Sequence, residues 1–280
     1  MSSEYAGSAV EAWRAQVEKH HAQSEGVMEA SLREGDFWRK LAPMFRADPY
    51  RTDDEILNVL LEMVSEDATV LDVGGGAGRF AIPIALRRGA SATVVDPSPS
   101  MLEQLEGAAS EVEGANVMGV NAEWESARVE AADLVLCSHV VYGVADIGPF
   151  VQKLHDHARG RVVMVSFVDS PQAGVAPLWE PVYGEERINL PALPELMNVL
   201  WGMGIYPSVR MMPPSGPQTF ESVEAAVEEV SGRLFIGSDT GRLQRLSESI
   251  EGYLEAVDGG YRIREARAVR QGVVWWDIEG

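Results

Sequence analysis

Apolar residues recur at helical spacing near the start of the chain. Val10, Trp13 and Val17 lie on one face of a helix, because residues three or four positions apart share a side. The pattern Ser8-x-x-Glu11 is typical of a capping box, so we expect this helix to begin at Ser8.

A second helix is predicted from Thr52, where Thr52-x-x-Glu55 forms another capping box. Its apolar side carries Ile56, Leu57, Leu60, Leu61 and Val64. The stretch between the two helices is aromatic, with Phe37, Trp38, Phe45 and Tyr50. These rings suit either helix packing or a lid over a small ligand, and we interpret residues 1–51 as an N-terminal helical lid segment.

From residue 69 the pattern changes to short apolar runs that alternate with helices. The runs predict strands at residues 69–73, 92–96, 116–120, 133–137 and 161–167. Helices fit at residues 79–88, 101–109 and 146–158. This alternation predicts a parallel, doubly wound sheet, in which functional residues lie just after the strands.

The chain is less regular beyond residue 168. Five prolines between residues 169 and 194 predict an irregular excursion. A helix at 195–203, a strand at 206–212, a helical region at 221–256 and a last strand at 273–278 follow. The fold class is therefore expected to be α/β: a doubly wound, mostly parallel, seven-stranded Rossmann-like sheet with N-terminal helices and a helical cap insertion. Residues 52–168 would form its core, and residues 169–280 would complete the sheet and carry the cap.

Composition narrows the class of protein. The 280 residues include 23 Lys and Arg against 43 Asp and Glu, and the resulting charge of −20 repels polyanions, so we expect no nucleic-acid partner. The single cysteine, Cys137, excludes an internal disulfide and fits a reducing cytosol. No apolar run reaches the length of a membrane helix and the first residues show no basic region followed by a hydrophobic stretch, so we expect a cytoplasmic protein without membrane contact.

Two groups of charged residues are interpreted as solvated. The arginines of the dense C-terminal cluster are interleaved with apolar residues, which indicates an exposed helix or strand face; they are Arg262, Arg264, Arg267 and Arg270. The pairs His20-His21 and His155-x-His157 do not form a metal site by themselves, and we expect no metal.

The strongest chemical signal is a glycine-rich turn. Asp72 ends a predicted strand, and four glycines follow it before the next helix: Gly74, Gly75, Gly76 and Gly78. Glycines permit positive φ and close approach of a ligand to the backbone, and the helix N-terminus offers free N–H groups. We therefore expect a nucleotide-like ligand, with a tight turn that binds nothing as the alternative.

The next predicted strand ends in Asp96-Pro97, 18 residues after Gly78. A carboxylate at this position can accept hydrogen bonds from both hydroxyls of a ribose. The alternative for Asp96 is a turn or helix-capping role.

These motifs together resemble the class I S-adenosylmethionine-dependent methyltransferases over about residues 52–168. The resemblance rests on Asp72-x-Gly74-x-Gly76-x-Gly78, Asp96, Asn121-Ala122-Glu123 and Cys137-Ser138-His139. It implies S-adenosyl-L-methionine as the cofactor, with Asp72 orienting the loop and the cofactor amino group, Gly74 and Gly76 at the methionine part and Asp96 at the ribose.

Further cofactor contacts are expected from the same resemblance. Asn121 stands where many members have an aspartate, and its amide oxygen can accept from the adenine amino group. Met101 would lie over the adenine or in the core, and Trp124 would close the adenine pocket or pack beside it. The expected cofactor residues are Asp72, Gly74, Gly76, Gly78, Asp96, Pro97, Met101, Asn121, Ala122, Glu123 and Ser138.

Catalytic candidates follow the fourth predicted strand. Ser138, His139 and Tyr142 would lie near the sulfonium methyl group, where the His139 imidazole could take a proton from the acceptor. Methyl transfer mainly requires in-line positioning, so a base is not obligatory. His139 and Tyr142 are the expected catalytic residues.

We therefore expect a methyltransferase that acts on a small-molecule acceptor, which would enter under the aromatic N-terminal segment and the 169–260 region. The alternatives are a non-catalytic cofactor-binding or regulatory protein and a nicotinamide-dependent dehydrogenase. The acceptor atom and the oligomeric state stay open.

Overall fold

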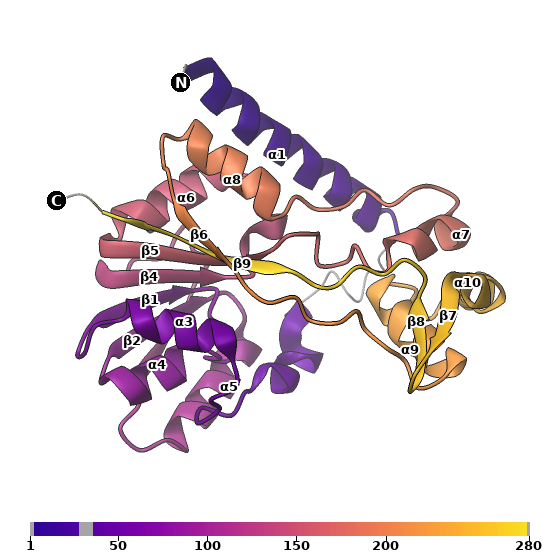
Figure 1. Cartoon of the computed structure of the whole chain (residues 1–280). Helices are drawn as coiled ribbons and strands as arrows, with labels where there is room; N and C mark the ends of the chain where they lie inside the picture. The colour runs from indigo at the N-terminus through magenta and orange to yellow at the C-terminus, as the bar shows by residue number, and fades with distance from the viewer. Residues whose placement is uncertain (1–2, 28–35, 279–280) are drawn as a thin grey trace.

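The computed structural model describes residues 3–27 and 36–278. A seven-stranded sheet with the strand order β3-β2-β1-β4-β5-β9-β6 forms its centre (Figure 1). The strands are β1 (Thr69–Val73), β2 (Ser91–Asp96), β3 (Asn116–Asn121), β4 (Ala132–Ser138), β5 (Ala158–Phe167), β6 (Ser208–Met211) and β9 (Gln271–Asp277). Only β9 runs antiparallel to its neighbours in the sheet. The predicted α/β fold with a mostly parallel sheet is confirmed.

Helices cover both faces of the sheet, which explains why its strands show no polar alternation (Figure 1). In β4, Val135 and Cys137 face a core cluster with α1 (Ser3–Glu25), α6 (Ile147–Asp156) and α8 (Leu193–Gly202). Leu134 and Leu136 face the opposite cluster, with α3 (Glu55–Met63), α4 (Ala81–Arg88) and α5 (Pro99–Ser110).

Both predicted helix starts at the N-terminus are wrong. Helix α1 begins at Ser3. Ser8 and Glu11 therefore lie inside the helix and do not cap its start. Helix α3 is capped by Asp54 and not by Thr52, because the Asp54 carboxylate accepts from the Leu57 N–H at 3.1 Å. Asp54 also forms ion pairs with Arg51 and Arg79, which hold its carboxylate at the start of α3 and favour Asp54 over Thr52 as the capping residue.

Helix α1 belongs to the outer layer of the core rather than to a lid. It lies along α6 and α8, with Trp13 and Val17 buried and the Trp13 indole N–H donating to the Val144 carbonyl at 2.8 Å (Figure 1). Of the predicted lid segment, residues 28–35 lie outside the described residues. Two short 3-10 helices follow, η1 (Phe37–Lys40) and η2 (Ala42–Phe45), and both lie against α5.

His20 near the end of α1 is buried, contrary to the expectation of a solvated pair. Its Nδ1 lies 2.6 Å from the Ile188 carbonyl, and its Nε2 accepts from the buried Arg187 at 2.9 Å. Burial, together with the nearby Arg187 charge, lowers the pKa of His20 to about 4, so the ring is neutral at pH 7.

Two chain segments leave the sheet and form a cap with its own apolar cluster (Figure 1). The first lies between β5 and α8 and contains η4 (Ala176–Leu178) and α7 (Trp179–Tyr183). The second leaves after β6 at Met212 and returns at Gln271. It contains α9 (Val223–Arg233), α10 (Thr240–Tyr253), β7 (Leu254–Val257) and β8 (Gly260–Ile263).

The β7–β8 hairpin departs from the predicted helical region up to residue 256. Helix α10 ends at Tyr253, and the chain reverses at Asp258-Gly259, where Gly259 has a φ of 85°. A turn of this composition favours a hairpin over a continued helix.

The buried position of Trp13 predicts a large stabilising role for α1. Trp13→Ala should lower the free energy of unfolding by about 3–5 kcal/mol, because it leaves a cavity and an unpaired Val144 carbonyl. The matched control is Trp201→Ala on the neighbouring helix α8, where the side chain is 40% exposed. Chemical denaturation of both variants checks this, and equal losses would contradict the assignment of α1 to the core.

Candidate functional site

The glycine loop follows β1 and depends on left-handed backbone conformations. Gly74, Gly76 and Gly78 have φ values of 69°, 54° and 78°. A Cβ at Gly74 would lie 2.3 Å from Val140, and one at Gly78 would lie 2.4 Å from Leu105, so these two glycines allow close packing. A Cβ at Gly76 would meet nothing closer than the Met101 sulfur at 3.5 Å. Gly76 therefore borders the space that a ligand can use.

Asp96 closes the other side of this space from the end of β2. Its Oδ2 accepts from the Gly76 N–H at 3.0 Å, and its Oδ1 accepts from the Ser98 N–H at 2.9 Å. Burial raises the pKa of Asp96, although the two backbone hydrogen bonds oppose the shift. The carboxylate and the loop are thus held in one arrangement.

Asp72 lies beneath the loop at the end of β1. Its side chain is fully buried, and its Oδ1 has no hydrogen-bond partner in the part of the chain that the structure describes. Burial, with a contribution from Asp96, raises the pKa of Asp72 to about 7. A buried carboxylate oxygen without a partner is suited to receive a cationic donor.

A third carboxylate, Asp36, is a site residue that the sequence did not reveal. It caps η1, accepts from the Ser98 hydroxyl at 2.9 Å and accepts from the Ser100 N–H at 2.9 Å. Burial opposes its ionisation, but the hydrogen bonds from Ser100, Ser98 and Trp38 prevail and lower the pKa of Asp36. These contacts join residues more than 60 positions apart, so no local sequence pattern predicts them.

Asn121 holds the turn that follows Asp96. Its amide nitrogen donates to the carbonyls of Asp96 at 3.1 Å and Pro97 at 3.0 Å. Its side-chain oxygen accepts no hydrogen bond within the described residues and is left available. Ala122 donates its N–H to the Asp96 carbonyl at 3.3 Å, whereas the Glu123 side chain is exposed.

Met101 and Trp124 were each expected either at the adenine or in the packed interior, and the structure places them differently. Met101 is buried on α5 with Ala42 and Ala77, and its sulfur is also the nearest atom to the space at Gly76. Trp124 is buried between Phe150 and His157, and its indole N–H donates a hydrogen bond to the Phe150 carbonyl at 3.3 Å. Trp124 is therefore a packing residue.

His139 follows β4, directly after the half-buried Ser138, and has a φ of 59°, an uncommon conformation for a side chain with a Cβ. Its Nδ1 lies 2.9 Å from the Tyr142 hydroxyl, which also accepts from the Phe167 N–H at 2.7 Å. The Phe167 ring stacks on the imidazole at a centroid distance of 4.2 Å. These contacts join the ends of β4 and β5.

Burial sets the charge state of both catalytic candidates. It lowers the pKa of His139 to about 4 and raises the pKa of Tyr142 to about 12. Both side chains are neutral at pH 7. Since the Tyr142 oxygen receives the Phe167 N–H, its own proton is free to go to His139 Nδ1, which leaves the imidazole N–H on Nε2.

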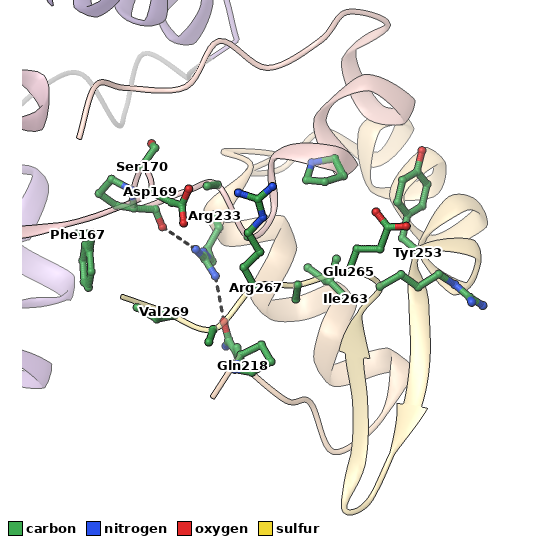
Figure 2. Close-up of a pocket in the computed structure, with 18 of the residues that line it drawn as sticks. Phe167, Asp169, Ser170, Gln218, Arg233, Tyr253, Ile263, Glu265, Arg267 and Val269 are labelled. Atoms are coloured by element: carbon green, nitrogen blue, oxygen red, sulfur yellow. Dashed lines mark hydrogen bonds between the residues drawn. The ribbon is translucent and has the colours of Figure 1, made fainter. Parts of the chain in front are cut away.

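A cavity of about 780 Å³ lies between the cap and the ends of β5 and β9 (Figure 2). Phe167 lines it from the sheet, and Phe220, Tyr253 and Ile263 line it from the cap. The cavity therefore meets the His139 region at Phe167.

The N-terminal aromatics do not line this cavity. Trp38, Phe45 and Tyr50 are 38%, 44% and 60% exposed, and Trp38 packs edge-on against Phe45 at 5.4 Å. Their segment lies against α5, and a lid over the acceptor stays a prediction for these rings.

Residues 3–27 and 36–278 contain neither a metal-binding cluster nor a membrane-spanning helix. No group of three or more His, Cys, Asp or Glu side chains in them could hold a metal ion. None of their helices combines the length and the apolar character that a membrane crossing requires.

Comparison with known proteins agrees with this geometry. An uncharacterized protein of Haemophilus influenzae is 25% identical over 251 residues, which are 86% of this chain and 87% of that protein. The crystal structure of the YcgJ protein from Bacillus subtilis has a TM-score of 0.55 at 15% identity, covering 81% of this chain and 99% of that one. The structure of coclaurine N-methyltransferase, solved with N-methylheliamine and S-adenosylhomocysteine, has a TM-score of 0.52 at 15% identity. The match covers 99% of this chain and 88% of that chain.

The family comparison is more specific than the likeness of folds. A model described as "Methyltransferase domain" matches residues 44–205, which include the glycine loop, Asp96 and His139. This agrees with the resemblance to class I S-adenosylmethionine-dependent methyltransferases that the glycine motif indicated. The chain belongs to this family of methyltransferases.

Proposed function

We propose that this protein transfers the methyl group of S-adenosylmethionine to a small-molecule acceptor. The observation that carries the proposal is the glycine loop itself, whose Gly76 N–H is held by Asp96 and beneath which the Asp72 oxygen lies buried without a partner among the described residues. When bound, the cofactor would supply a sulfonium methyl group: the acceptor atom would form a bond to the methyl carbon while the carbon–sulfur bond breaks and S-adenosylhomocysteine leaves. Its sulfonium and ammonium charges outnumber its single carboxylate, so acidic surroundings favour it.

Each polar group around the loop suits one part of the cofactor. Asp72 would receive the ammonium group, Asp96 would accept from the ribose hydroxyls, and the free oxygen of Asn121 would accept from the adenine amino group. Gly76 would contact the methionine part through its backbone. The other proposed cofactor residues are Gly74, Gly78, Pro97, Met101, Ala122, Glu123 and Ser138.

The acceptor would occupy the cavity under the cap, with its reacting atom beside Phe167 and His139. We assign His139 the role of a neutral residue that positions the acceptor, since a pKa near 4 makes the imidazole a weak base at pH 7 and its ring is held by the side chains of Tyr142 and Gln271. The Tyr142 hydroxyl orients the imidazole. Methyl transfer then depends mainly on in-line alignment within a closed site.

The two alternative functions are distinguished by charge and by turnover. A dinucleotide would place its pyrophosphate near Asp36, Asp72 and Asp96, where like charges repel. A non-catalytic cofactor-binding protein would bind the cofactor equally well. Transfer of a labelled methyl group from S-adenosylmethionine to a small molecule excludes that alternative.

Titration calorimetry tests the cofactor assignment. The wild-type protein should bind S-adenosylmethionine and S-adenosylhomocysteine but not NAD. Asp96→Ala should weaken S-adenosylhomocysteine binding by about 2 kcal/mol or more, roughly a 30-fold rise in Kd, because two charge-assisted hydrogen bonds to the ribose are lost. Asp133→Ala is the control, since Asp133 lies at the amino end of β4, away from the glycine loop, where it accepts from the Thr69 N–H and pairs with Arg159. A folded Asp96→Ala protein with unchanged affinity would place the ribose elsewhere.

A pair of glycine variants compares a loop position that has room for a Cβ with one that is tightly packed; both glycines are among the proposed cofactor residues. Both Gly76→Ala and Gly78→Ala put a Cβ on a residue with positive φ, so both incur similar backbone strain. Gly78→Ala should unfold at a markedly lower temperature, because its Cβ would lie 2.4 Å from Leu105. Gly76→Ala should stay closer to wild type in thermal unfolding but bind S-adenosylhomocysteine about tenfold more weakly or worse. Full affinity in Gly76→Ala would remove Gly76 from the cofactor site.

The charge state of His139 can be followed directly. Its ring signals in NMR should stay constant between roughly pH 8 and roughly pH 5.5, because burial keeps the imidazole neutral and moves its pKa to about 4. The His139→Gln spectrum identifies these signals by their disappearance. A midpoint near the ordinary value of 6.5 would contradict the neutral positioning role.

A further inference from the structure

The lining of the cap cavity is unusually basic for an acidic protein. Four of the chain's 23 Lys and Arg residues line it, against two carboxylates, Asp169 and Glu265. The four are Arg233, Arg264, Arg267 and Arg270. Four positive against two negative side chains leave a surplus of two positive charges in a chain whose net charge is −20.

Two of these arginines are already engaged by neutral groups. Arg233 donates to the Gln218 side chain and to the Pro171 carbonyl, each at 3.0 Å, as the dashed lines of Figure 2 mark. Arg264 donates from Nε to the Gly252 carbonyl at 3.0 Å. Neither contact neutralises a charge.

The side chains of Arg267 and Arg270 make no ion pair or hydrogen bond with any described residue. Asp169 and Glu265 likewise form no ion pair within the described ranges, so the cavity does not compensate its own positive charge. Arg264, Arg267 and Arg270 are exposed, as the expectation of a solvated face has it, and their solvated face is also part of the cavity lining. Figure 2 places Arg267 in the middle of the lining, between Phe167 and the β8 end at Ile263.

A further polar group in the cavity lacks a partner. Ser170 is 8% exposed and lines the cavity, and its hydroxyl has no hydrogen-bond partner among the described residues. The remaining walls are apolar and aromatic, with Phe167, Phe220 and Tyr253. Such a lining suits a ligand with an apolar body and one anionic end.

Arg270 also connects this basic lining to the reaction centre. Its carbonyl accepts from the Val168 N–H at 2.8 Å, one residue beyond Phe167, whose ring stacks on His139. An anion at Arg270 and Arg267 would therefore hold the apolar part of a ligand towards Phe167.

We propose that the methyl acceptor is an anionic small molecule, whose carboxylate, sulfate or phosphate group binds Arg267 and Arg270 while its apolar body fills the cap cavity. The identification of this ligand as the acceptor rests on the proposed methyltransferase function. The anion site itself rests only on the cavity and its unpaired arginines.

Two fluorescent probes that differ in one charge test the anion site. 1-Anilinonaphthalene-8-sulfonate and N-phenyl-1-naphthylamine share their ring system, but only the first carries a sulfonate. The wild-type protein should bind the sulfonate probe about tenfold more tightly, or better. Equal affinities for the two probes would overturn the proposal without any variant being needed.

The double variant Arg267→Gln/Arg270→Gln locates the site. It should lose about tenfold or more in affinity for the sulfonate probe and keep its affinity for the neutral probe. Arg262→Gln is the matched control, because Arg262 lies in the same segment, pairs with Glu255 and does not line the cavity. A double variant that binds the sulfonate probe like wild type, or a control that loses as much, overturns the assignment.

Calorimetry with S-adenosylhomocysteine on the same proteins separates this inference from the proposed function. The cofactor affinity should be the same in the wild type and the double variant, since neither arginine is placed at the glycine loop. Absence of binding in the wild type would refute the proposed function while the probe titrations still decide the anion site. Normal cofactor binding with failed probe titrations would refute the anion site alone.

Discussion

The hydrogen bond from the Gly76 N–H to the Asp96 carboxylate is the contact on which the site depends. It ties the loop after β1 to the end of β2 and sets the position of both around the ligand space. The loop can take this course because its glycines adopt positive φ, and because Gly74 and Gly78 leave room for Val140 and Leu105. This arrangement holds Asp96 beside the loop that covers Asp72, and the turn after Asp96 receives Asp36 through Ser98 and Ser100.

The cap is anchored to the same core by a buried cation. Arg187 stacks over Trp179 of the cap at 3.9 Å and donates to Gln23, His20 and Ser24 of helix α1. Burial lowers the pKa of Arg187 to about 10, well above pH 7, so the guanidinium keeps its charge while His20 stays neutral and can accept its hydrogen bond. Helix α1 therefore holds the cap as well as covering the sheet.

The parts of the fold that were predictable from the sequence are those with a local cause. The run Leu134 to Cys137 is apolar without alternation because both faces of the sheet are covered, and the glycine loop is set by residues within a few positions of one another. The misplaced start of α1 and the missed β7–β8 hairpin arose where two local patterns competed. The place of Asp36 could not be predicted, because its carboxylate contacts Ser98 and Ser100 far away in the chain, and neither could the cavity beside Arg267, because distant segments enclose it.

The second cap segment has its two ends at one place on the sheet. The Met212 N–H donates to the Gln271 carbonyl at 2.9 Å, and a further bridge joins Ser215 to Val269. Residues 216–268 therefore leave and rejoin the sheet between two paired segments, 212–215 and 269–271. The insertion disturbs the sheet no more than a short hairpin would. Such an insertion can change in length without disturbing the register of the sheet, because both of its ends are fixed at the same pair of strands.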